Sequence, residues 1–133
     1  MSTQRIHASA TIGEGTTLGE FVVIGAHVTI GAGCRIGNFV VIHEGTVVGD
    51  HVRIDDHATL GKLPMKAANS ATTKEQELPA LTVGELCIVG TGVVLYRGAV
   101  IDAKVLMADL CTVRENVTVG RGTIIGRGVT IEN

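Results

Sequence analysis

The sequence predicts an all-β solenoid of about six triangular coils with one inserted loop, and three observations lead to this prediction. An aliphatic residue recurs every six positions along most of the 133 residues, and the glycines keep the same register. Hydrophobic residues make up 45% of the chain but aromatic residues only 2%, so the core must consist of aliphatic side chains. In a solenoid, each short repeat buries its apolar side together with its neighbours. We therefore expect a single domain over residues 1–133.

Each six-residue unit has the pattern of a very short β-strand. The aliphatic residue follows a small or β-branched residue two positions earlier, as Ile24 follows Val22. Residues two apart in a strand point to the same side, so both positions are expected to face the core. The nineteen aliphatic anchors are Ile6, Ile12, Leu18, Ile24, Ile30, Ile36, Ile42, Val48, Ile54, Leu60, Val83, Val89, Leu95, Ile101, Met107, Val113, Val119, Ile125 and Ile131.

Glycine marks the turns between the expected strands. Of the 18 glycines, eleven directly follow an anchor and seven lie three residues after one. Six residues are too few for a strand, a turn and a return, so three units should close one triangular coil, and successive coils should stack about 4.8 Å apart. If the turn lies directly after the anchor, His7 and His43 replace a turn glycine, whereas His27, His51 and His57 point outward from flat faces.

An inserted loop over residues 61–82 interrupts the repeat. The anchors on either side, Leu60 and Val83, are 23 residues apart in the sequence, which is not a multiple of six, and both prolines lie between them. Long loops inside compact domains are often functional. The loop residues that could contact an anionic ligand are Lys62, Lys66, Asn69 and Lys74. The alternative is a plain surface excursion.

Two rows of apolar residues are predicted to lie outside the core. Their members recur 18 residues apart, so they should stack from coil to coil, and exposed apolar rows favour subunit contacts. We interpret them as contacts of a homotrimer: Phe21, Val23, Phe39 and Val41 in one row, and Leu86, Ile88, Leu106 and Ile124 in the other. The three cysteines, Cys34, Cys87 and Cys111, fall on inward positions and are expected to fill the core.

Charge and composition exclude several classes of function. The chain has 11 basic and 13 acidic residues, whereas a nucleic-acid-binding domain usually has a basic excess. No apolar run is long enough to span a membrane, and the N-terminus lacks the apolar stretch of a secretory signal, so we expect a cytoplasmic protein. The spacing of the five histidines does not suit three ligands on one zinc ion, so we expect no metal.

Polar residues interrupt the glycine pattern, and they share one edge of the prism if the loop returns the chain to the next corner. That edge would carry His7, His43, Tyr96, Arg114 and Glu132. Histidine titrates near neutral pH, so His43, with Glu44 beside it, is a candidate general base for an acceptor amine or hydroxyl. The alternative is a solvated turn histidine.

The hexads resemble those of the hexapeptide-repeat acyltransferase superfamily. The stretches ATLGKLPMKAANSATTKE, GTGVVLYRGAVI and GRGVTIEN are similar to those of bacterial nucleotide-sugar N- or O-acetyltransferases, although this chain is short of their C-terminal coils. The resemblance implies a left-handed parallel β-helix, a homotrimer, and acetyl-CoA as co-substrate with no tightly bound cofactor. It also implies a small-molecule acceptor bound near Lys62, Asn69, His43, Tyr96 and Arg97. Arg114, on the same predicted polar edge, is a further candidate for substrate binding.

Two functions from different classes follow from this sequence. The first is transfer of an acetyl group from acetyl-CoA to an amino-sugar nucleotide or a similar small acceptor. The second is a non-catalytic trimeric β-helix that binds a small anionic ligand or acts as an oligomeric scaffold. The loop and the segment around Tyr96 and Arg97 favour the enzyme, whereas the shorter C-terminal part favours the second function.

Overall fold

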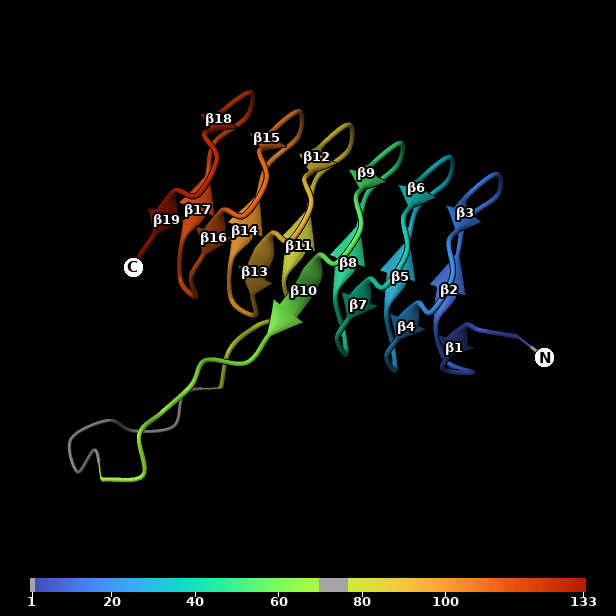
Figure 1. Ribbon diagram of the computed structural model, residues 1–133, viewed down its shortest axis with the longest axis horizontal. Coiled ribbons are helices and arrows are strands. Elements are labelled where there is room, and N and C mark those ends of the chain that lie inside the picture. The colour runs from blue at the N-terminus through green and yellow to red at the C-terminus, as the bar shows by residue number, and fades with distance from the viewer. Residues whose placement is uncertain (1, 70–76) are drawn as a thin grey trace.

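The computed structural model describes residues 2–69 and 77–133, which form nineteen short parallel strands (Figure 1). The strands are β1 (Arg5–Ile6), β2 (Thr11–Ile12), β3 (Thr17–Leu18), β4 (Val23–Ile24), β5 (Thr29–Ile30), β6 (Arg35–Ile36), β7 (Val41–Ile42), β8 (Val47–Val48), β9 (Arg53–Ile54), β10 (Thr59–Lys62), β11 (Thr82–Val83), β12 (Ile88–Val89), β13 (Val94–Tyr96), β14 (Val100–Ile101), β15 (Leu106–Met107), β16 (Thr112–Val113), β17 (Thr118–Val119), β18 (Ile124–Ile125) and β19 (Thr130–Ile131). The described residues form no helix, and so none that is long and apolar enough to cross a membrane.

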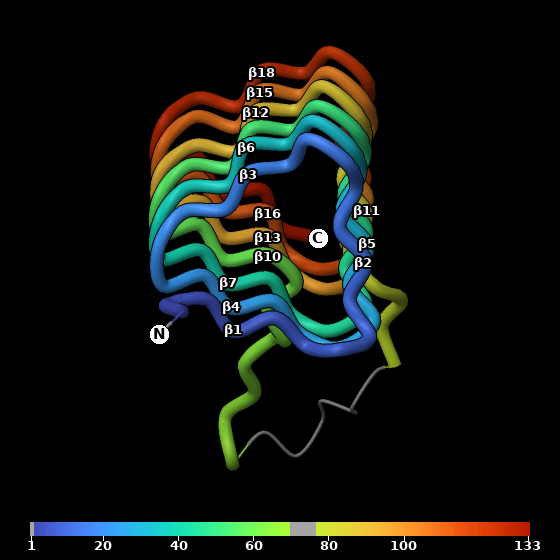
Figure 2. The backbone as a smooth tube through the Cα atoms, turned by 90° about the vertical axis from the view of Figure 1, so that its right-hand side faces the viewer, coloured from blue at the N-terminus to red at the C-terminus, as the bar shows by residue number. Residues whose placement is uncertain are grey.

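The strands form three sheets, one on each side of a triangular prism. The orders are β1-β4-β7-β10-β13-β16-β19, β2-β5-β8-β11-β14-β17 and β3-β6-β9-β12-β15-β18. Figure 2 views the prism from its N-terminal end, and there the chain runs anticlockwise from β1 through β2 to β3 while it recedes from the viewer. The coil is therefore left-handed. The predicted class, a left-handed parallel β-helix of about six triangular coils, is confirmed.

The core consists of the anchors and of the residues two positions before them. Along the middle coils both sets are buried, as at Val40 and Ile42, which are 0% exposed. Cys34, Cys87 and Cys111 are also buried and free, which confirms that they fill the core. Burial raises the pKa of the Cys111 thiol to about 11, so this thiol stays protonated and unreactive at neutral pH.

The tight turns lie two residues later than the glycine pattern suggested. Left-handed backbone occurs at the third residue after an anchor, where Gly33 has φ 66°. His27, His51 and His57 occupy the same place, with φ of 58°, 55° and 62°, so the prediction that they point outward from flat faces is wrong. Glycine is the residue that adopts this conformation most easily. Histidine is nevertheless used here, and the ring of His51 covers Gly33, where a Cβ would lie 2.4 Å from His51 Nδ1.

The glycines directly after the anchors have another cause, which is the close stacking of coils. A Cβ on Gly84 would lie 2.6 Å from the backbone nitrogen of Ala103 in the next coil, and a Cβ on Gly13 equally close to the nitrogen of Ala32. Neither glycine has a positive φ. At Gly13 and Gly84, glycine is therefore needed because the next coil leaves no room for a side chain.

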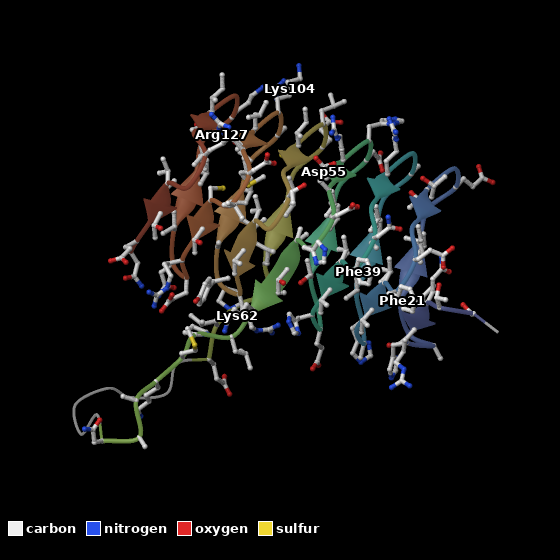
Figure 3. All side chains as sticks on the ribbon, in the orientation of Figure 1. Phe21, Phe39, Asp55, Lys62, Lys104 and Arg127 are labelled. Carbon is white, nitrogen blue, oxygen red and sulfur yellow. The ribbon has the colours of Figure 1, made fainter. Side chains whose placement is uncertain are left out.

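Both predicted apolar rows are in register on the surface. Phe21 and Phe39 lie on neighbouring coils (Figure 3), and their rings stack with the centroids 5.3 Å apart. The His57 ring continues the stack 4.9 Å from Phe39. Val23 pairs with Val41 beside them. In the other row Ile88, Leu106 and Ile124 lie on consecutive coils, and Leu86 lies at the corner before Ile88. That these rows form a homotrimer stays a prediction.

The inserted loop takes the place of one corner turn of the prism, the turn between β10 and β11. Its first residues extend β10 to Lys62, and the chain resumes in the next sheet with β11 at Thr82. The loop therefore returns the chain to the next corner in sequence, as the predicted polar edge required. Lys74 lies outside the described residues.

Candidate functional site

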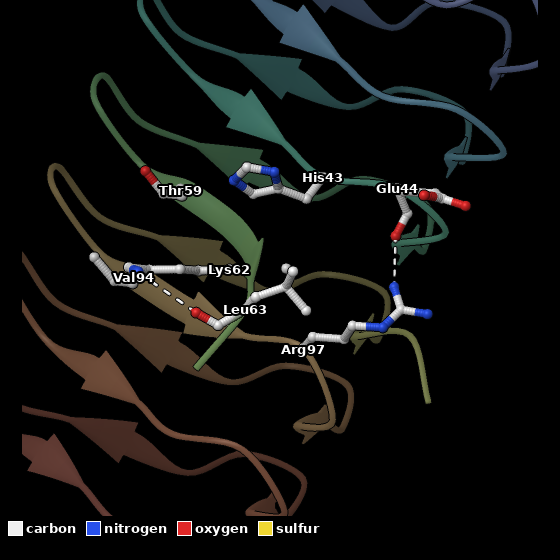
Figure 4. A pocket seen from close by; sticks show the side chains of 8 residues that line it. His43, Glu44, Thr59, Lys62, Leu63, Val94 and Arg97 are labelled. Carbon is white, nitrogen blue, oxygen red and sulfur yellow. Dashed lines mark hydrogen bonds between the residues drawn. The ribbon is translucent and has the colours of Figure 1, made fainter. Parts of the chain in front are cut away.

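A hollow of about 650 Å³ opens on the predicted edge, where the loop leaves the prism (Figure 4). Strands β7, β10 and β13 lie side by side in one sheet, so the residues that follow them are brought to one edge although the loop separates them in sequence. The hollow is lined by His43, Glu44, Thr59, Gly61, Lys62, Leu63, Val94 and Arg97. Of the predicted site residues, His43, Glu44, Lys62 and Arg97 are thus brought together.

A bulge at Gly61 shapes the floor of this hollow. Gly61 has φ 84°, and the register of β10 shifts there, so that Leu60 pairs with Leu95 but Lys62 pairs with Tyr96. A Cβ on Gly61 would lie 2.5 Å from Thr46 Oγ and 3.3 Å from His43 Cβ. Both the backbone conformation and the lack of space therefore require glycine at this position.

His43 lies at the first position after the anchor of β7, and its backbone N–H donates to the carbonyl oxygen of Leu60 at 2.8 Å. Partial burial, and after it the charge of Lys62, lower the pKa of His43 below its ordinary value of 6.5. The imidazole is consequently neutral at pH 7, which is the form that accepts a proton. The carboxylate of Glu44 points away from the His43 ring (Figure 4).

Tyr96 and Arg114 lie farther along the same edge and do not line the hollow. Tyr96 is 5% exposed, with Lys62 Nζ 5.5 Å and the Arg114 guanidinium 4.9 Å from its ring centre. Arg114 also pairs with Glu115 at 2.9 Å. The Tyr96 ring therefore packs against the ammonium group of Lys62. Asn69 is exposed on the loop and does not line the hollow.

The guanidinium of Arg97 is occupied by backbone contacts. Its Nη1 donates to the carbonyl oxygen of Glu44 at 2.8 Å, and its Nε donates to that of Leu78 at 3.0 Å. Two of its donor groups are thus committed to the protein. The sequence analysis predicted Arg97 as a substrate-binding residue, whereas in the structure its guanidinium binds backbone carbonyl groups.

Thr46 is a residue of this region that sequence reasoning missed. It is 0% exposed, and its hydroxyl has no hydrogen-bond partner among the described residues. Thr16 holds the corresponding inward position on another row, and there the hydroxyl donates to Gly31 O at 2.7 Å and accepts from Cys34 N at 3.0 Å. Gly61 follows Thr46 at the same sequence spacing, 15 residues, at which Gly31 follows Thr16. The left-handed bulge at Gly61 therefore removes the partner that the regular coil would supply.

Replacing Thr46 with valine is expected to raise the free energy of unfolding by about 1 kcal/mol or more, because a buried hydroxyl without a partner costs about 1–3 kcal/mol. The matched change Thr16→Val removes a bonded hydroxyl and should lower it by about 1 kcal/mol. Urea unfolding followed by circular dichroism measures both. Equal losses in the two variants would contradict the unpaired state of Thr46.

Within residues 2–69 and 77–133, no three histidine, cysteine, aspartate or glutamate side chains gather closely enough to hold a metal ion. The polar groups that line the hollow suit acid–base chemistry and the binding of charged ligands. A neutral histidine beside an ammonium group can take a proton from a nucleophile while the ammonium holds an anion.

A family model described as bacterial transferase hexapeptide (six repeats) matches residues 9–44 and 27–62. A comparison with curated protein sequences gives no match. Among solved structures, the chain is similar to a histidine-to-alanine mutant of GDP-perosamine N-acetyltransferase from Caulobacter crescentus in complex with CoA and GDP-perosamine. The TM-score is 0.78 and the identity 26%, over 97% of this chain and 52% of that one.

Two further structures are similar in fold. UDP-N-acetylglucosamine O-acyltransferase from Moraxella catarrhalis gives a TM-score of 0.73 at 19% identity, over 98% of this chain and 59% of that one. A putative acetyltransferase from Bacillus cereus gives 0.58 at 23% identity, over 96% of this chain and 68% of that one. The chain spans about half the length of the Caulobacter enzyme.

Proposed function

Because the chain is a member of the hexapeptide-repeat superfamily of left-handed β-helices, we propose that it is an acyltransferase that moves an acetyl group from acetyl-CoA to an amino-sugar nucleotide or a similar small acceptor. The observation that carries the proposal is the neutral His43 beside Lys62 in an open hollow at the loop. The likeness to an N-acetyltransferase described with CoA and GDP-perosamine supports it.

In the proposed reaction the acceptor amine attacks the carbonyl carbon of the acetyl thioester. A carbon–nitrogen bond forms, the carbon–sulfur bond breaks, and CoA leaves as a thiolate that takes up a proton. His43 accepts the proton that the amine loses, for which its lowered pKa suits it at pH 7. Backbone N–H groups at the glycine corners are proposed to stabilise the oxyanion formed on the carbonyl.

Lys62 is proposed to bind the anionic part of the acceptor. Its ammonium group lies over the Tyr96 ring and reaches the hollow from the bulged end of β10. A compact positive charge of this kind suits the phosphate groups of a nucleotide sugar. Asn69, Tyr96 and Arg114 are retained as outer positions of the same site, since none of them lines the hollow.

We also propose that the protein is a cytoplasmic homotrimer whose sites lie between neighbouring subunits. The two apolar rows supply the contacts. Ile124 is 76% exposed and Phe21 54% exposed in the single chain, which leaves them free to be covered by another copy.

Isothermal titration of the purified protein with acetyl-CoA and with CoA tests the proposed function, together with the mass in solution from light scattering. A trimer that binds acetyl-CoA with micromolar affinity is expected, followed by acetylation of an amino-sugar nucleotide detected by mass spectrometry. A protein that binds neither CoA compound at millimolar concentration would contradict acetyl transfer and would favour a non-catalytic scaffold or anion-binding protein.

A further inference from the structure

The returning end of the inserted loop is seated on the same corner that carries His43. Two glycines of this corner make room for it. A Cβ on Gly45 would lie 3.3 Å from the Cβ of Ala80, and a Cβ on Gly98 would lie 3.2 Å from Leu78 Cδ2. Both glycines hold the left-handed turn position, which His27 and Asn116 fill on neighbouring coils of this corner. The returning end therefore packs where the turn side chains are missing.

Arg97 joins this returning end to the two segments that line the hollow. Its backbone N–H donates to Lys62 O at 2.9 Å, at the point where the loop departs. Its guanidinium donates to Leu78 O at 3.0 Å on the returning end, and to Glu44 O at 2.8 Å on the turn after His43 (Figure 4). The two guanidinium bonds span 19 and 53 residues of sequence.

We infer that Arg97 is a positioning residue, which locks the returning end of the loop and the Glu44 turn into one arrangement and so fixes His43 in the hollow. The inference rests on the proposed function for its catalytic consequence. It assigns the guanidinium to the protein and leaves the binding of the anionic acceptor to Lys62. The planar fork of arginine reaches two carbonyl groups at fixed angles, whereas a lysine ammonium at this position is a single point charge.

Two variants separate this role from a contact with the acceptor. Arg97→Met removes both the charge and the fork, and Arg97→Lys keeps the charge but loses the fork. Cleavage by a glutamyl endopeptidase after Glu77, an exposed residue next to Leu78, measures how often the returning end leaves the corner. Cleavage is expected to be about tenfold faster in both variants, because each loses hydrogen bonds to a charged donor.

The pKa of His43, measured by NMR in Arg97→Lys, reports on the surroundings of the imidazole. It would not change if the variant only loosened the returning end of the loop. The positive charge is kept, so a rise towards the ordinary value would report a site that has opened to water. In the same variant, kcat is expected to fall about tenfold with a smaller change in KM, since misplacement of a catalytic group affects the chemical step.

Arg53→Met is the control, because Arg53 is exposed on another face and pairs only with Asp55 among the described residues. It should match the wild type in all three measurements. Wild-type cleavage rates in both Arg97 variants, or an unchanged pKa of His43 in Arg97→Lys, would overturn the inference. A wild-type protein that transfers no acetyl group would refute the proposed function, while the cleavage rates would still decide whether Arg97 holds the loop.

Discussion

Replacing His43 with alanine is expected to lower kcat/KM for acetyl transfer by about 10²- to 10⁴-fold, the usual contribution of a general base. The imidazole lines the hollow, and its lowered pKa leaves it neutral at pH 7. Folding should be little affected, because the imidazole is only partly buried and alanine keeps the backbone N–H and the Cβ, through which His43 contacts the next coil. The measurement is the initial rate of CoA release with an amino-sugar nucleotide as acceptor.

The pH dependence of the same rate follows from the direction of the pKa shift. A base whose pKa lies below 6.5 works in its unprotonated form, so kcat/KM should be constant above pH 7 and should fall as the pH decreases through the pKa of His43. Burial is the main cause of the shift and Lys62 the second. Lys62→Gln removes one positive charge, so it should move the falling limb to higher pH, towards 6.5.

His51→Asn is the matched control for the rate measurement on His43→Ala. His51 lies at a left-handed turn on another corner, and asparagine tolerates that conformation better than alanine does. Its rate should stay within about twofold of the wild type, as expected for a residue outside the site. A His43→Ala protein that keeps its rate within the same range would remove His43 as the base and leave proton transfer to the substrate.

The six-residue period was sufficient to predict the coils, the three sheets and the polar edge. The reason is that each strand pairs with the strand three units further along the chain. That strand is 18 residues away except across the loop, where Leu60 pairs with Leu95. Counting units therefore places His43 near Tyr96 once the loop is known to return the chain to the next sheet. The turn position was predicted wrongly, because glycine occurs at two positions for different reasons. Directly after the anchor, as at Gly84, glycine prevents a clash of a side chain with the next coil. At the third residue after the anchor, as at Gly33, glycine adopts a positive φ.

The finer features of the site depend on where the loop meets the prism, which the period does not describe. The bulge at Gly61 leaves the Thr46 hydroxyl without a hydrogen-bond partner in the part of the chain that the structure describes, yet in the sequence both residues fit the regular pattern. The resemblance indicated Arg97 as a substrate-binding residue, and in the structure Arg97 lines the hollow. Its contact with Leu78 could not be predicted, because the loop has no repeat from which a register could be counted.

The largest effect on stability is expected from Gly84→Ala in the middle of the solenoid. The new Cβ would lie 2.6 Å from the nitrogen of Ala103 and 2.8 Å from the carbonyl carbon of Asp102, both of which are backbone atoms that cannot move alone. The coil must shift, and overpacking of this kind costs about 1–3 kcal/mol of unfolding free energy. Each coil contacts only its neighbours, so the shift also weakens the stacking on both sides.

Gly120→Ala tests whether the next coil is the cause. Gly120 holds the same position on the same corner, two coils further along, and a Cβ there would meet nothing within 4 Å. Neither glycine has a positive φ, so the intrinsic preference for alanine is equal in both variants. Gly120→Ala should therefore be neutral or stabilising by about 0.4–1 kcal/mol, through the lower entropy of the unfolded chain. Urea unfolding of both variants measures the difference, and equal destabilisation would mean that these glycines are required by backbone conformation and not by coil stacking.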